Sequence, residues 1–108
     1  MPKPTDQQIE GLKDRYGEVY EFTGEGEDGQ EYSFLFRKPD RAALSRFAAK
    51  GTKDVMKAVN NLVFDCLLYP GAEEVQRLFD RMPGLPIALG AELQKTIGST
   101  MDFFRRPL

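Results

Sequence analysis

The chain has 108 residues, of which 41% are hydrophobic and 30% are charged, a balance typical of a single globular domain. It contains no histidine and one cysteine, which excludes histidine-based catalytic or metal sites, an internal disulfide and a cysteine-rich zinc site. No apolar run approaches the ~20 residues of a membrane span, and the first residues lack the apolar segment of a signal peptide. We therefore expect a cytoplasmic protein that does not interact with membranes.

Charge is distributed unevenly along the chain. Residues 1–36 hold nine acids and three bases, a net charge of −6, whereas residues 37–57 hold seven bases and two acids, a net charge of +5. The remainder carries −1, which brings the total to −2. An acidic first third followed by a basic segment indicates a partner-binding surface, or self-association through patches of opposite charge.

The first third of the chain predicts a helix followed by a β-hairpin. Residues 5–15 have apolar side chains at helical spacing, after a capping residue at Thr5 or Asp6. Residues 18–23 and 31–37 alternate in hydrophobicity as strands do, and Asp28-Gly29 between them favours a tight turn. Because an isolated hairpin is marginally stable in water, helices must cover its aromatic face. Five residues form that face: Tyr20, Phe22, Tyr32, Phe34 and Phe36.

Proline and glycine residues divide the rest of the chain into four predicted helices. Their expected bounds are about 40–50, 52–69, 73–82 and 86–97. Asp40 is expected to cap the first of them, with Ala43, Leu44 and Phe47 facing inward, and the Thr52 hydroxyl is expected to cap the second. The second helix has a long apolar stripe that would bury seven residues: Val55, Met56, Val59, Leu62, Val63, Cys66 and Leu67.

This order of elements predicts an α+β fold that is mainly α. An N-terminal helix and a β-hairpin would pack on a bundle of about four helices. Residues 1–98 are expected to form a single domain, and residues 99–108 a C-terminal tail of apolar and basic residues.

The sequence offers no pattern for catalysis. Residues 24–29 match the spacing G-x-G-x-x-G, but a strand follows them and their acids would repel phosphate, so a turn is expected and not a nucleotide site. The same acidic segment lacks EF-hand spacing. Cys66 lies on an apolar stripe without an activating partner, which predicts a buried, inert thiol. We expect no catalytic residue, no cofactor-binding residue, no metal ligand and no enzymatic activity.

Two features instead suggest contact with a macromolecule. One is the basic segment between residues 37 and 57, which lacks a helix-turn-helix, zinc or RNP signature and so favours a protein over a nucleic acid. The other is the tail, whose aromatic residues either pack on the domain or form an apolar docking segment. The expected partner-binding residues are Arg37, Arg41, Arg46, Lys50, Met101, Phe103 and Phe104.

Several segments resemble the tail assembly chaperones of tailed phages. Residues 32–41, YSFLFRKPDR, are similar to the strand exit of that family, and residues 58–70 are similar to its central helix, which closes on a proline. Residues 74–85 resemble the next helix with its Pro-Gly-Leu turn, and residues 88–98 resemble the last helix. The resemblance spans roughly residues 12–98 and leaves the tail outside.

The resemblance implies a non-enzymatic protein of a phage or prophage, made in the cytoplasm of the bacterial host. Such proteins bind the long, helical tape measure protein and keep it soluble while tail tube subunits polymerise around it. The implied partners are the tape measure protein, the tail tube protein and further copies of the chain itself, with no nucleic acid and no membrane. Two alternatives stay open, namely a structural subunit of the tail or virion and a small nucleic-acid-associated regulator.

Overall fold

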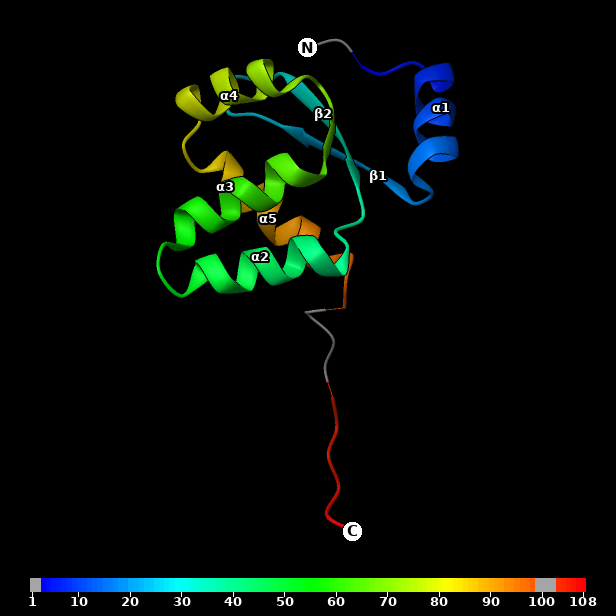
Figure 1. Cartoon of the computed structure of the whole chain (residues 1–108). Helices are drawn as coiled ribbons and strands as arrows, with labels where there is room; N and C mark the ends of the chain where they lie inside the picture. The colour runs from blue at the N-terminus through cyan, green and yellow to red at the C-terminus, as the bar shows by residue number, and fades with distance from the viewer. Residues whose placement is uncertain (1–2, 99–102) are drawn as a thin grey trace.

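The computed structural model describes residues 3–98 and 103–108, and within them the chain forms five helices and a three-stranded antiparallel sheet (Figure 1). This arrangement confirms the predicted α+β fold, mainly α. The elements in chain order are α1 (Asp6–Tyr16), β1 (Val19–Glu25), β2 (Glu31–Arg37), α2 (Arg41–Gly51), α3 (Val55–Cys66), β3 (Leu67–Tyr69), α4 (Ala72–Arg81) and α5 (Leu85–Lys95).

The β1–β2 hairpin pairs in continuous antiparallel register up to Glu25, which lies opposite Glu31 at the tip. The turn that follows is closed by a hydrogen bond of 3.0 Å from the N–H of Gly29 to the carbonyl oxygen of Gly26. Gly29 has a φ of +78°, which glycine adopts at no steric cost. The turn predicted at Asp28-Gly29 is therefore confirmed.

A third strand takes the place of the last turn of the helix predicted over residues 52–69. The helix α3 ends at Cys66, and β3 pairs antiparallel with β2, with Leu67 opposite Phe36. A short apolar run has no periodicity that separates a strand from a buried helix, and the residue before Pro70 is biased away from helical backbone. The predicted end of this helix was therefore wrong, and β2 becomes the central strand of the sheet, in the order β1-β2-β3.

The start of α3 also differs from the prediction. The carboxylate of Asp54 accepts a hydrogen bond of 3.1 Å from the N–H of Lys57, so Asp54 caps this helix and Thr52 does not. Val55 and Met56, predicted to begin the buried stripe, are 62% and 45% exposed. They lie in the first turn of α3, whereas the buried residues of this helix begin at Ala58.

The caps of α1 and α2 follow the sequence pattern. Asp40 accepts the N–H of Ala43 at 2.8 Å, as its predicted capping role requires. Thr5 and Gln8 form a reciprocal capping box at the start of α1. The inward face of α2 is narrower than predicted, because Ala43 is buried and Phe47 packs on the core whereas Leu44 is exposed.

The core lies between the aromatic face of β2 and the helices α2–α5. Phe36 is fully buried, and its ring centroid lies 5.0 Å from that of Phe22 on β1. Ser33 and Leu35 alternate to the opposite face of the strand and are buried as well. No residue of α1 is buried, and this helix packs mainly against β1.

Close packing of α3 on α5 depends on the absence of a side chain at Gly90. A β-carbon at this position would lie 2.9 Å from Cγ1 of Val59, which is closer than such atoms approach in proteins. We expect Gly90→Ala to lower the free energy of unfolding by about 1–3 kcal/mol through overpacking, although alanine is the better helix former. Urea denaturation measures this difference.

Gly11→Ala is the matched control, because no atom lies within 4 Å of a β-carbon built at this position in α1. This control should not destabilise the protein. In a Val59→Ala background the cost of Gly90→Ala should shrink, since the clashing methyl group is gone. A Gly90→Ala protein as stable as the wild type would contradict the packing described here.

Candidate functional site

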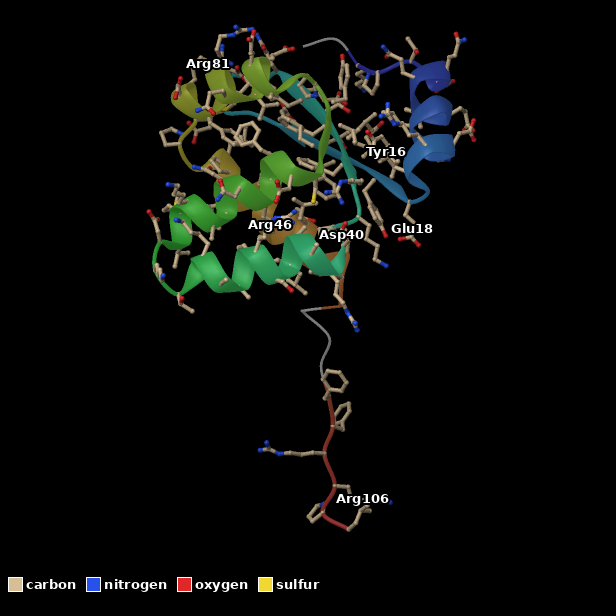
Figure 2. The ribbon with its side chains drawn as sticks, in the orientation of Figure 1. Tyr16, Glu18, Asp40, Arg46, Arg81 and Arg106 are labelled. Carbon is tan, nitrogen blue, oxygen red and sulfur yellow. The ribbon has the colours of Figure 1, made fainter. Side chains whose placement is uncertain are left out.

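Two of the arginines predicted to bind a partner are bonded within the domain. Arg37, on β2, donates a hydrogen bond of 2.9 Å from Nη2 to the carbonyl oxygen of Asp65, and its Nη1 lies 3.7 Å from Oδ2 of Asp40. Arg46, on α2 and labelled in Figure 2, has its Nη2 3.2 Å from Oδ2 of the same Asp65. Asp65 therefore joins β2 and α2 to the last turn of α3, a role that the sequence did not indicate.

The carboxylate of Asp40 interacts both with Arg37 and with the backbone of α2. The N–H of Ala43 stabilises its charged form and lowers the pKa of Asp40 below the usual 3.8, and the positive charge of Arg37 acts in the same direction. Asp40 thus serves both as the cap of α2 and as a second acceptor beside Arg37. Arg37 is mainly a structural residue in this arrangement, since its side chain is only 23% exposed.

The other two basic site residues on α2 are separated along the helix. Arg41 and Lys50 stand nine residues apart, about 14 Å along the axis of an α-helix. Neither forms an ion pair with any residue that the structure describes. Lys50 instead lies near the turn into α3, together with Lys53 and Lys57.

The turn between α2 and α3 combines positive charge with exposed apolar side chains. We define the α2–α3 corner as five residues: Lys50, Lys53, Val55, Met56 and Lys57. Its lysines form no ion pair within residues 3–98 and 103–108, and its two apolar residues are the exposed start of α3. The one acid nearby, Asp54, is engaged with the backbone of α3. This surface suits an acidic partner that also offers apolar side chains.

The described part of the C-terminal tail lies apart from Arg37 and Arg46 and from the α2–α3 corner. Residues 103–108 extend away from the helical part of the domain, coloured red in Figure 1. Phe103 is 83% exposed and Phe104 is fully exposed. Met101, the third tail residue predicted to bind a partner, lies outside the described residues. The structure thus does not bring the predicted tail residues and the basic residues together.

A groove that the sequence did not predict runs between the hairpin and α5. Phe22, Phe34 and Leu89 line its interior, and its volume is about 200 Å³. It continues past Leu85 and Ala88 beneath the turn from α4 to α5. We call this hollow the hairpin groove. Its lining residues come from four elements, and the apolar ones have the composition of an ordinary core, so no local pattern marks them.

One end of the hairpin groove is fixed by a chain of two hydrogen bonds. Nη2 of Arg81, on α4, donates to the hydroxyl oxygen of Tyr32 at 3.1 Å, and the Tyr32 hydroxyl donates to Oδ2 of Asp28 at 2.7 Å. The bond to Asp28 lowers the pKa of that carboxyl below 3.8 and raises the pKa of Tyr32 above 10. The tip of the hairpin is thereby held to α4.

Cys66 is buried, and no metal-binding cluster forms among the residues that the structure describes. The Cys66 thiol is buried, and burial raises its pKa to about 11, so it is protonated at neutral pH, as expected of an inert cysteine. Among the described residues, no three acidic or cysteine side chains gather as a metal ion would require. No helix in the described part of the chain has the length and hydropathy needed to cross a membrane.

The alanine variants of Arg37 and Arg41 should differ in their free energy of unfolding, because only Arg37 is bonded within the domain. Arg37→Ala removes a charge-assisted bond to the end of α3 and should cost about 1.5 kcal/mol of unfolding free energy. Arg41→Ala removes an exposed side chain and should change stability by less than about 0.5 kcal/mol. Urea denaturation of both variants tests this difference. Equal stability of the two variants would show that the Arg37 contact contributes nothing.

Tyr32→Phe should raise the pKa of Asp28 towards its ordinary value, because the hydroxyl that stabilises the carboxylate is gone. A lowered folded pKa stabilises the protein above the unfolded pKa of about 3.8, and that stabilisation disappears as pH falls through the lowered value. The variant should therefore lose less stability than the wild type between pH 4 and pH 2.

Carboxyl chemical shifts in an NMR titration measure this directly. Asp40 is an internal control, since its pKa is lowered by the backbone of α2 and should stay low in both proteins. An unchanged pKa of Asp28 in the variant would refute the role given to the Tyr32 hydroxyl.

Comparison with known proteins places the chain in a family without assigning it an activity. A solved structure, "uncharacterised protein rbstp2171" from Bacillus stearothermophilus, is 28% identical in sequence and covers 91% of this chain and 99% of its own, with a TM-score of 0.77. No curated protein gives a match. A family pattern matches residues 12–106 and so runs past residue 98 into the tail, including Phe103 and Phe104. The chain belongs to this family, which is described as "Domain of unknown function (DUF6848)".

Proposed function

We propose that this protein is a non-enzymatic assembly chaperone of tailed phages. It binds the tape measure protein in the cytoplasm of the bacterial host and keeps that partner soluble while the tail tube assembles around it. The resemblance of residues 12–98 to tail assembly chaperones supplies the partner. The α2–α3 corner is the observation that supports a binding role, because apolar residues are exposed there among free lysines.

The corner has the chemistry to hold an elongated helical chain. Burial of the exposed parts of Val55 and Met56 contributes about 25 cal/mol for each Å² removed from water. The surrounding lysines favour a segment whose apolar stripe is flanked by acids, and their charge speeds encounter and fixes orientation more than it adds affinity. An amphipathic helix of the tape measure protein meets both requirements.

The corner is presented by a rigid support. Arg37 and Arg46 join β2 and the middle of α2 to the end of α3 through Asp65, so the two helices that meet at the corner are also linked away from it. A preformed surface loses less conformational entropy on binding than a mobile one. The buried stripe of α3 and the partly buried Phe47 of α2 add to this rigidity.

Co-expression with the tape measure protein tests the proposal. The wild type should keep that partner in the soluble fraction and co-purify with it. Val55→Glu should weaken co-purification about tenfold, because it loses apolar contact and adds charge at the corner. The substitution is compatible with folding, since an acidic residue is favourable in the first turn of a helix.

Ile87→Glu is the matched control. Ile87 is 53% exposed and lies in the first turn of α5, outside the corner. This variant should retain full binding. A tape measure protein that precipitates beside the free wild type would refute the chaperone proposal, and finding the protein in purified phage particles would favour the structural-subunit alternative instead.

A further inference from the structure

The hairpin groove can hold an aromatic ring. Its interior is formed by Phe22, Phe34 and Leu89, and its volume of about 200 Å³ exceeds the about 150 Å³ of an apolar cavity that accepts benzene. The groove is open on one side beside Ala88, which is exposed on α5. A phenylalanine side chain from outside the domain could therefore enter it and contact carbon atoms on several sides.

The rim of the hairpin groove is acidic. Glu25 and Glu92 border the apolar part, where Glu92 is paired with Lys95 at 2.9 Å, and Glu27 and Asp28 border its continuation under the α4–α5 turn. Arg81 is the one base that lines either part among the described residues, and it is bonded to the Tyr32 hydroxyl. The groove thus selects an apolar segment that carries positive charge.

The C-terminal tail has this composition. Phe103 and Phe104 are exposed to water and are followed directly by Arg105 and Arg106. Phenylalanine and arginine are both enriched at protein interfaces relative to the rest of the surface. The match of the family pattern through residue 106 shows that this segment belongs to the family and is not an unrelated extension.

We propose that the tail of one copy docks in the hairpin groove of a second copy, with Phe103 or Phe104 in the apolar part and Arg105 and Arg106 at the acidic rim. A second copy is the occupant because residues 103–108 extend away from the helical part of their own domain (Figure 1).

The resulting contact is heterologous, because a tail on one copy meets a groove on the next. Such head-to-tail contacts build rings or open chains of subunits, and they strengthen with protein concentration. This assignment gives Phe103 and Phe104 a role in self-association, where the sequence left open whether the tail meets a partner or another subunit. It rests on the groove and the tail alone and does not depend on the proposed function.

Sedimentation velocity over a range of concentrations tests the contact. The wild type should associate with increasing concentration. Two full-length variants should each remain monomeric: Phe103→Ser/Phe104→Ser, which lacks the aromatic anchors, and Ala88→Arg, which fills the groove and adds a positive charge beside its acidic rim. Because each retains the half that the other lacks, an equimolar mixture of the two should form a one-to-one complex. Raising the salt concentration should weaken the association, since the rim charges are exposed.

Ile87→Arg is the matched control for the groove variant, because it adds the same charge to α5 at a neighbouring exposed position outside the groove. It should associate as the wild type does. Circular dichroism checks that each variant is folded. Should Ala88→Arg fail to fold, a peptide of residues 99–108 added to Phe103→Ser/Phe104→Ser provides the second measurement, with NMR shifts expected at Phe22 and Leu89.

Three results would overturn the proposal. A wild type that stays monomeric at every concentration would exclude self-association and would fit a tail that folds back on its own domain. A mixture of the two variants that forms no complex would exclude head-to-tail docking. A peptide that binds without shifting the groove residues would place the tail elsewhere. None of these results would bear on binding of the tape measure protein at the α2–α3 corner.

Discussion

The burial of β2 is the constraint on which the rest of the structure depends. Every residue from Tyr32 to Phe36 is buried, although the sequence pattern assigns only its aromatic residues to a covered face. A strand in this position needs partners along both edges and cover on both faces, because its backbone groups and its apolar side chains are all removed from water. β1 and β3 supply the edges, and the helices α3–α5 supply the cover for the aromatic face.

The features that the sequence predicted correctly are those decided within a few residues. The cap at Asp40, the turn at Asp28-Gly29 and the alternation of the hairpin each depend on neighbours along the chain. β3 could not be predicted in this way. Three residues form a strand there because the free edge of β2, more than 30 residues earlier in the chain, offers hydrogen-bond partners.

The same limit applies to the buried stripe of α3. Helical periodicity continues through Val55 and Met56, but the elements that bury the stripe do not reach the first turn of the helix. Periodicity identifies the apolar side of a helix and gives no information on how far along it the rest of the protein extends. Two residues that sequence analysis assigned to the core are therefore part of the surface that we propose as a binding site.

The charge pattern of the sequence likewise did not distinguish basic side chains that are bonded within the domain from those that are free to bind a partner. Arg37 and Arg41 are equivalent by composition, and only the position of Asp65 shows that one of them is engaged within the domain. The hairpin groove is harder still to foresee, because it is formed where four elements meet and its lining residues resemble a core. In a small domain of this kind, binding surfaces can be recognised mainly from the folded structure, because it shows which charged and apolar groups already have partners within the domain.

The two proposed contacts lie on different elements and can operate together. The α2–α3 corner belongs to the turn between two helices, whereas the hairpin groove is formed by the hairpin and the segment from α4 to α5. A few exposed apolar residues and lysines give only modest affinity for one segment of a long helix. When neighbouring copies are joined head to tail, each bound copy raises the effective concentration of the next along the same chain. Weak individual contacts would then suffice to cover an elongated partner, and separation of the copies would release it.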